Sequence, residues 1–245
     1  MKLPIFQILN YTLILIVLIL FIRYIWDMLF DRDYQPASWR EARKRKELSR
    51  DLLKAERNYP DKVRFFSWWI QAERLKREGV RGSFAELGVY KGDSARVIHR
   101  MDPDRKFHLF DTFGGFTRDD LKGETGEAAT YTTENFADTS VEKVMRRIGG
   151  NRNIETHPGY FPDSAVCLEN ESFAFVNIDC DLYKPSKAGL DFFYPRLSRG
   201  GVIFVHDYNP KWEGIMKAVD EFCKATGESF VLLPDMEGTA MIVRR

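Results

Sequence analysis

Four side chains able to bind a cation or move a proton lie at the ends of two runs typical of β-strands. Asp179 and Asp181 end the run FAFVNIDCD, and His206 and Asp207 end the run GVIFVHD. Carboxylates that converge on one place repel one another unless a divalent cation neutralises them. The expected cation ligands are Asp181, His206 and Asp207, an oxygen-rich set that favours Mg²⁺ or Mn²⁺ over Zn²⁺. The alternative is that Asp179 and Asp207 only cap helices or turns.

The same residues are the candidate catalytic bases. A divalent cation lowers the pKa of a hydroxyl group that it binds. Asp179 or Asp181 is expected to take the proton from that hydroxyl, and His206 takes this role if it is not a cation ligand.

A turn rich in glycine follows another β-type run, SFAELGV. It contains Glu86, Gly88 and Gly92, and a helical stretch begins near Ser94. The glycines let the backbone approach a ligand closely, and the start of a helix offers unpaired N–H groups. The turn lacks the Gly-X-Gly-X-X-Gly pattern, and a carboxylate there repels a pyrophosphate but attracts an ammonium group. This favours S-adenosylmethionine over NAD, with a nicotinamide-dependent oxidoreductase as the alternative enzyme.

Two further segments are expected to surround the cofactor. The run FHLFDTF places Asp111 about 20 residues beyond the glycines, where a carboxylate accepts hydrogen bonds from ribose hydroxyls. The alternative for Asp111 is a helix cap or turn residue. Segment 157–164, HPGYFPDS, is expected to edge an adenine ring, although Tyr160 and Phe161 equally suit packing in the core.

Short β-type runs alternate with helical stretches after residue 80. The runs are SFAELGV, FHLFDTF, NIETHPG, FAFVNID, GVIFVHD, SFVLLP and AMIVRR, and the helical stretches are 94–100, 141–148, 187–197 and 214–225. This alternation predicts a mostly parallel sheet covered by helices on both faces. The last two runs are joined by the short segment 234–238, which predicts an antiparallel hairpin at one end of the sheet. Ligands of such sheets bind beyond the carboxyl ends of the strands.

Five motifs in order resemble the macrocin-O-methyltransferase family. They are FAELGVYKGDSA, FHLFDTFGGF, GYFPDS, VNIDCDLYKPS and LSRGGVIFVHDYN, and the resemblance runs from about residue 61 to the C-terminus. It implies a class I methyltransferase fold, that is, a Rossmann-like, doubly wound, mostly parallel sheet of seven strands. It also implies methylation of a sugar hydroxyl by S-adenosylmethionine with Mg²⁺. The last motif departs from the family, because His206-Asp207-Tyr208 stands where Asp-Asp-Tyr is usual.

The first three motifs contain the residues expected to bind the cofactor: Glu86, Gly88, Tyr90, Gly92, Ser94, Asp111, Thr112, Phe113, Gly159, Asp163 and Ser164. Segment 117–139 is long enough to form a lid over a sugar or glycan acceptor, the alternative being a disordered surface loop. A non-catalytic, membrane-tethered scaffold is a second alternative function. The acidic cluster argues against it, because a scaffold has no need to confine like charges.

The N-terminus differs from the rest of the chain. Residues 5–22, IFQILNYTLILIVLILFI, carry no charge and are about long enough to cross a membrane. Tyr24 and Trp26 follow, where aromatic rings suit the membrane interface. A cleaved signal peptide needs a small-residue cleavage site, which is not found after the run. We therefore expect a membrane anchor rather than a signal peptide or a buried amphipathic helix.

Flanking charges predict the orientation of this anchor. Lys2 precedes it, whereas the basic residues after it are Arg23, Arg32, Arg40, Arg43, Lys44, Arg45 and Lys46. The positive-inside bias predicts a single-pass protein with its catalytic domain on the cytoplasmic side. The cluster at 40–46 either touches anionic lipids or is a solvated helical linker.

The expected domains are an anchor at 1–30, a basic helical linker and cap at 31–80, and a methyltransferase domain at 81–245. Aromatic residues at 65–70 are expected to pack on that domain or on a second copy of the chain in a homodimer.

Composition excludes several classes of protein. The chain has 245 residues, 44% of them hydrophobic and 14% aromatic, which excludes a disordered or collagen-like protein. Its 37 basic and 36 acidic residues give a net charge of +1, so the overall charge gives no argument for a nucleic-acid partner. The 3 cysteines, Cys167, Cys180 and Cys223, form no CxxC pair. They argue against a disulfide framework or a structural zinc site and fit a reducing compartment.

Overall fold

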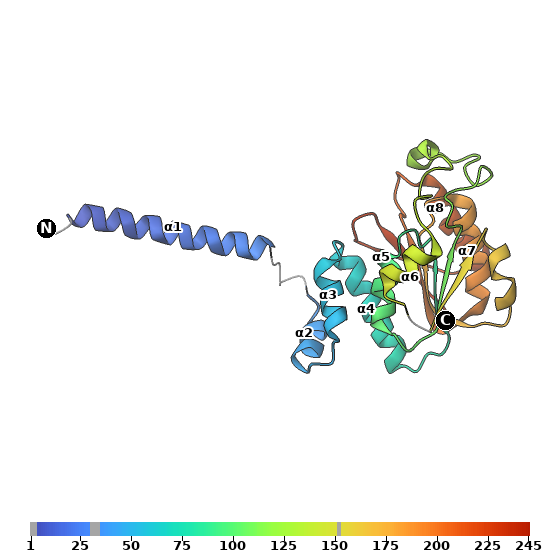
Figure 1. Cartoon of the computed structure of the whole chain (residues 1–245), viewed down its shortest axis with the longest axis horizontal. Helices are drawn as coiled ribbons and strands as arrows, with labels where there is room; N and C mark the ends of the chain where they lie inside the picture. The colour runs from blue at the N-terminus through green and yellow to red at the C-terminus, as the bar shows by residue number, and fades with distance from the viewer. Residues whose placement is uncertain (1–3, 30–34, 151–152) are drawn as a thin grey trace. The chain divides into compact units, whose positions relative to one another are not determined.

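The computed structural model describes residues 4–29, 35–150 and 153–245 of the chain (Figure 1). The chain divides into two compact units, Met1–Leu48 and Ser49–Arg245. Lys2 and Arg32, two of the charges that flank the expected anchor, lie outside the described residues. The first unit contains helices α1 (Ile5–Leu29) and α2 (Ala37–Lys44).

Helix α1 is long and apolar. Its segment Ile5–Trp26 has a mean hydropathy of 2.6, so by length and composition it is able to cross a membrane. A signal sequence or the core helix of a soluble protein passes the same test. The Thr12 hydroxyl donates to the carbonyl of Ile8 at 2.9 Å, which satisfies this polar group inside the helix. The predicted helix is confirmed, and its insertion in a membrane stays a prediction.

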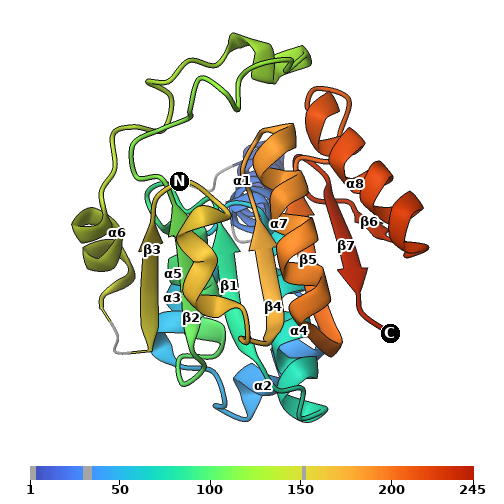
Figure 2. The ribbon, with the colours of Figure 1, turned by 90° about the vertical axis from the view of Figure 1, so that its right-hand side faces the viewer.

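The second unit contains one sheet of seven strands, in the order β3–β2–β1–β4–β5–β7–β6 (Figure 2). Five strands are parallel, namely β1 (Ser83–Leu87), β2 (Phe107–Asp111), β3 (Ile154–Pro158), β4 (Phe173–Ile178) and β5 (Leu197–His206). Strands β6 (Val231–Leu233) and β7 (Thr239–Val243) form an antiparallel hairpin, and β7 pairs with β5. The predicted seven-stranded sheet and its terminal hairpin are confirmed.

Helices cover both faces of the sheet (Figure 2). One face carries α3 (Arg50–Asn58), α4 (Lys62–Arg77) and α5 (Asp93–Met101), and α6 (Val141–Ile148) packs beside α5. The other face carries α7 (Tyr183–Arg196) and α8 (Glu213–Thr226). The short helices η1 (Gly126–Thr130) and η2 (Asp163–Leu168) lie in connections. Helix α7 begins four residues before the predicted stretch, because Pro185 falls in its first turn, where a missing N–H is tolerated.

Aromatic side chains fill the layers on either side of the sheet. Every residue of β1 and β4 is buried, as expected for central parallel strands. On one face, Phe175 contacts Phe84 and Phe204 with ring centroids 4.9 and 5.1 Å apart. On the other face, Phe110 contacts Phe193 at 5.6 Å. Burial of each such ring contributes about 1.5–3 kcal/mol, so the strand ends that carry the site are firmly held.

The aromatic residues of α4 pack on the domain that follows them. Trp68 is fully buried and lies edge-on to His206 at the end of β5, with centroids 5.6 Å apart. It also contacts Tyr59 at 5.4 Å. Trp68 therefore packs on the domain that follows it, which is one of the two predicted alternatives. A homodimer stays a prediction.

Candidate active site

A cavity of about 350 Å³ opens at the carboxyl ends of the parallel strands. Of the residues expected to bind a cofactor, those that line it are Gly88, Tyr90, Ser94, Asp111, Thr112 and Gly159. Glu86, Gly92, Phe113, Asp163 and Ser164 lie outside its lining. Asp179 and Asp181 also line it. The structure therefore brings the glycine turn, the end of β2 and the acidic end of β4 to one cavity, where sheets of this type bind ligands.

Asp111 holds the turn after β1. Its Oδ2 accepts hydrogen bonds from the backbone N–H groups of Val89 and Tyr90, both at 2.8 Å. Its Oδ1 accepts from the N–H of Phe113 at 2.7 Å. Asp111 therefore acts as a turn residue, which is the alternative to its expected role in binding ribose hydroxyls. A carboxylate has about four acceptor positions, so Asp111 also keeps capacity for a ribose hydroxyl.

Gly88 allows the ends of β1 and β4 to meet. Its φ is +88°, and a Cβ added to it would lie 1.9 Å from the carbonyl oxygen of Asp179. Gly92 has φ +79° and precedes α5, whose first turn no side chain caps. Among the described residues, the N-cap thus offers no side-chain acceptor to the N–H groups of that turn, which lies at the rim of the cavity.

Glu86 lies fully buried at the end of β1. Its Oε1 accepts from Asn177 Nδ2 at 2.8 Å, and the side chain of Ser94, which lines the cavity, also interacts with this carboxyl group. Burial raises the pKa of Glu86 to about 8. A cationic group bound nearby would favour the ionised carboxylate and complete its interactions.

Three carboxylates form the acidic cluster of Asp179, Asp181 and Asp207. One oxygen from each lies within 4.8 Å of the others. Burial and the charges of the other two raise the pKa of Asp181 well above its ordinary value. Burial and Asp179 raise the pKa of Asp207 to about 7, while Arg64 opposes the shift. Burial and mutual repulsion therefore disfavour ionisation of all three groups together, and a bound cation would favour it.

Backbone conformation also distinguishes this region. Asp181 and Asp207 adopt φ of 59° and 62°, and Tyr90 and Phe113 adopt 48° and 53°. A left-handed conformation is uncommon for residues other than glycine, although aspartate adopts it more readily than tyrosine or phenylalanine. Phe136, which lines the cavity, and Lys46, in the first unit, have the same conformation.

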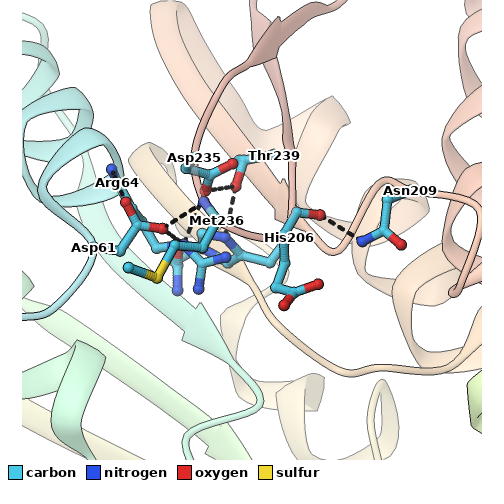
Figure 3. A network of polar contacts seen from close by, with 9 residues as sticks. Asp61, Arg64, His206, Asn209, Asp235, Met236 and Thr239 are labelled. Carbon is cyan, nitrogen blue, oxygen red and sulfur yellow. Dashed lines mark hydrogen bonds and ion pairs between the residues drawn. The ribbon is translucent and has the colours of Figure 1, made fainter.

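His206 belongs to a separate hydrogen-bond network, part of which is drawn in Figure 3. Its Nε2 lies 2.6 Å from Asn177 Oδ1, and its Nδ1 lies 2.9 Å from Thr239 Oγ1. Burial lowers the pKa of His206 well below its ordinary value. Both ring nitrogens thus have partners away from the acidic cluster. The structure brings Asp181 and Asp207 together as expected for cation ligands, but it does not bring His206 to them.

Arg64 is a charged residue of this region that sequence reasoning missed. It extends from α4, and its Nε donates to Asp235 Oδ2 at 2.9 Å (Figure 3). Asp61, the N-cap of α4, accepts from the N–H groups of Arg64 and Met236, both at 2.9 Å. These bonds join α4 to the connection between β6 and β7. No local pattern reveals this arrangement, because its parts are far apart in the sequence.

The two aromatic residues predicted to edge an adenine ring both line the cavity. Phe161 is also buried against Phe110 and Phe193, so core packing accounts for it as well. Tyr160 is exposed, lines the cavity and donates from its hydroxyl to Asp120 Oδ1 at 2.9 Å. Asp163 and Ser164 are the first two residues of η2, and the Oγ of Ser164 is buried without a partner among the described residues.

Segment 117–139 carries aromatic rings toward the acidic cluster. Tyr131 packs against Phe116, Phe136 and Trp212, with centroids 5.2 to 5.7 Å apart. Burial raises the pKa of Tyr131, and the charges of Asp181 and Asp207 add to this effect. The hydroxyl of Tyr131 is therefore within electrostatic reach of these carboxylates. The segment is expected from the sequence as a lid, whereas none of its rings is predicted to be a site residue.

The segment is also attached to the main domain. Glu124 Oε1 accepts from the N–H of Tyr183 at the start of α7, at 2.8 Å. The Glu127 N–H donates to the carbonyl of Lys211 at 2.9 Å. These contacts position the aromatic rings of the segment beside the site.

Residues 38–237 match the profile of the macrocin-O-methyltransferase (TylF) family. The chain belongs to this family. Its relatives include the mycinamicin III 3''-O-methyltransferase of Micromonospora griseorubida, which is 30% identical over 149 residues, or 56% of this chain and 59% of that protein. They also include the 8-demethyl-8-(2,3-dimethoxy-alpha-L-rhamnosyl)-tetracenomycin-C 4'-O-methyltransferase of Streptomyces olivaceus, 26% identical over 56% of each chain. The chain thus spans somewhat more than half the length of these relatives.

Solved structures show the same fold as this member of the macrocin-O-methyltransferase family. The O-methyltransferase NovP superposes with a TM-score of 0.64 at 24% identity, over 75% of this chain and 80% of that one. An O-methyltransferase from Bacillus cereus, solved in complex with SAH, superposes with a TM-score of 0.51 at 17% identity, over 74% and 81% of the two chains. The class I methyltransferase fold predicted from the motifs is confirmed.

Proposed function

We propose that this protein transfers a methyl group from S-adenosylmethionine to a hydroxyl group of a sugar or glycoside, assisted by a divalent cation. One observation carries the proposal. The cofactor cavity and the acidic cluster share a wall, because Asp179 and Asp181 belong to both. A methyl donor in the cavity and a hydroxyl at the cluster would therefore lie next to each other.

The residues of the cavity fit S-adenosylmethionine. Glu86 lies fully buried behind the lining of the cavity, beside Ser94, which lines it, and its carboxyl group is suited to the ammonium group of the methionine part. Asp111 has acceptor capacity for the ribose hydroxyls. Gly88 and the uncapped first turn of α5 leave room and free N–H groups for the polar end of the ligand.

The acidic cluster fits a hard divalent cation. Asp179, Asp181 and Asp207 offer only oxygen, which suits Mg²⁺ or Mn²⁺. We propose these three as ligands, with Asp179 replacing His206 in the set predicted from the sequence. The cation supplies charge that lowers the pKa of an acceptor hydroxyl.

Side chains of the protein accept the proton and exclude water from the reaction. Asp179 and Asp181 line the cavity and are the carboxylates placed to take the hydroxyl proton. His206 is buried with both nitrogens hydrogen-bonded, which makes it unsuited to that step. Tyr131, whose ring packs on Trp212 and whose hydroxyl is within electrostatic reach of Asp181 and Asp207, would pack on a sugar ring bound at the cluster and exclude water.

The acceptor class rests on the relatives. One of them is named as a methyltransferase of a compound that carries a dimethoxy-rhamnosyl group. The N-terminal helix and the basic residues after it favour a single-pass membrane protein with the enzyme domain on the cytoplasmic side. An acceptor presented at or near a membrane surface would suit that location.

Formation of S-adenosylhomocysteine tests the proposal. The full chain in detergent is incubated with S-adenosylmethionine, Mg²⁺ and a panel of glycosides and nucleotide sugars. We expect product only when a sugar with a free hydroxyl is present. Tight binding of NAD and no binding of S-adenosylmethionine would overturn the proposal.

A further inference from the structure

Two imidazoles and a carboxylate gather on strands β2 and β3, away from the acidic cluster. His108 pairs with Glu155 in the parallel register, and Phe110 pairs with His157. Residues two apart on a strand point to the same face, so His108, Glu155 and His157 share one face of the sheet. Strand β3 is at the edge of the sheet, which leaves this group open to solvent on one side.

The distances within the group suit a single metal ion. His108 Nδ1 lies 2.8 Å from His157 Nε2 and 3.6 Å from Glu155 Oε2. One possible ligand atom from each residue lies within 4.8 Å of the others. Zinc–nitrogen bonds of about 2.0–2.1 Å place two nitrogens of a tetrahedral site roughly 3.3 Å apart. A small outward rotation of His157 would therefore open enough space for the ion.

The packing of the group holds the ligands but leaves access. His108 is fully buried, and the ring of His157 stacks on Phe110 with centroids 4.6 Å apart. The Glu155 side chain is 47% exposed and is held by Lys106 at 3.0 Å. The 2.8 Å contact between His108 Nδ1 and His157 Nε2 is a hydrogen bond in which one of these nitrogens carries the proton, so a bound cation would displace that proton to the other nitrogen of the same ring. His108 is thus held in the core, whereas the half-buried His157 and the exposed Glu155 lie toward solvent, where Glu155 would exchange its ion pair with Lys106 for a bond to the cation.

We propose that His108, Glu155 and His157 form a second cation site, which binds a borderline divalent ion such as Zn²⁺. Two imidazoles and one carboxylate match zinc, cobalt or nickel and disfavour magnesium. This site is chemically distinct from the all-oxygen acidic cluster. His157 is followed by Pro158 and Gly159, and Gly159 lines the cofactor cavity. An ion bound here would therefore stiffen one edge of that cavity.

Calorimetric titration with Zn²⁺ tests this site in the full chain, with saturating Mg²⁺ present to occupy the acidic cluster. We expect the wild-type protein to bind one Zn²⁺ ion. His157→Gln and Glu155→Gln should each weaken that binding by more than about tenfold, because each removes a ligand. Glu169→Gln, at an exposed glutamate elsewhere, is the matched control and should bind Zn²⁺ as the wild type does.

Two results would overturn the second site. One is equal Zn²⁺ affinity in the wild type, His157→Gln and Glu155→Gln. The other is loss of Zn²⁺ binding in Asp207→Asn, which would assign the ion to the acidic cluster. Circular dichroism of each variant checks that it is folded, and the exposed position of Glu155 makes its variant informative if His157→Gln is unstable. The proposed methyl transfer is independent of this outcome.

Discussion

At the scale of single residues, Glu86 is the group whose ionisation a bound cofactor would change most. Its pKa of about 8 means that it is mostly protonated at pH 7 in the free protein. An ammonium group beside it favours the carboxylate, so binding of S-adenosylmethionine is expected to release close to one proton per chain. Calorimetry at pH 7 in buffers of different ionisation enthalpy measures that release.

Glu86→Gln is the matched variant for this experiment. It keeps the shape and the contact with Asn177 but cannot lose a proton, so the release should disappear. Affinity should fall by about 1–3 kcal/mol, the scale of a lost hydrogen bond to a charged group. Equal proton release in wild type and variant would show that another group ionises. The raised pKa of Glu86 also implies that its contribution to stability is present below pH 4.5 and is lost as pH rises through about 8.

The cation ligands are distinguished by a pair of substitutions. Asp181→Asn removes a charge from the acidic cluster and should weaken Mg²⁺ binding by on the order of 10–100-fold. It should also raise the Tm of the cation-free protein, because it removes a group whose ionised form is disfavoured by burial and by repulsion from Asp179 and Asp207.

His206→Gln should have the opposite profile. It disturbs the bonds to Asn177 and Thr239, so we expect it to lower the free energy of unfolding by about 1–3 kcal/mol. Mg²⁺ affinity should change little. A large loss of Mg²⁺ affinity with unchanged stability would return His206 to the ligand set. Titration calorimetry and thermal unfolding of both variants supply these measurements.

At the scale of secondary-structure elements, the close meeting of β1 and β4 depends on Gly88. Alanine there would place Cβ 1.9 Å from the Asp179 carbonyl, at φ +88°. Gly123 has a similar φ of +86° with nothing within 4 Å of an added Cβ. Gly123→Ala should thus cost only about 1–3 kcal/mol for the conformation. Gly88→Ala should cost clearly more and abolish cofactor binding. Equal unfolding free energies for the two variants would contradict the close approach.

Strands and their order along the chain were accessible to sequence reasoning, because buried parallel strands are short, apolar and separated by helical stretches. The positions of Asp111, Asp179 and Asp181 followed from the rule that strand ends meet at one edge of the sheet. The position of His206 did not follow from this rule, because successive residues of a strand point to opposite faces. His206 is the last residue of β5, so it points away from the cluster to which Asp207 belongs.

Arg64 and Tyr131 were beyond sequence reasoning for a different reason. Both reach the site from segments outside the strand ends, one from α4 and the other from 117–139. Their positions depend on long-range packing, such as the bond from Arg64 to Asp235 and the contact of Tyr131 with Trp212. Residue types alone carry no signal for such contacts.

At the scale of the whole molecule, the N-terminal helix should determine where the protein is found. The full chain is expected to sediment with membranes and to resist extraction by high salt, because a spanning helix is held by apolar burial. A chain shortened to residues 33–245 should be soluble and still bind S-adenosylmethionine. Release of the full chain by salt alone would show that the basic residues at 40–46 hold it instead.

The central claim is methyl transfer to a sugar hydroxyl at the acidic cluster, and mass spectrometry of the acceptor after reaction tests it most directly. Wild-type protein with S-adenosylmethionine and Mg²⁺ is predicted to add one methyl group to an oxygen of the sugar. Chelation with EDTA should abolish the product, and added Mg²⁺ should restore it, while cofactor binding stays nearly intact because Glu86 and Asp111 lie outside the cluster. Full activity after exhaustive chelation, or in Asp181→Asn, would contradict the account.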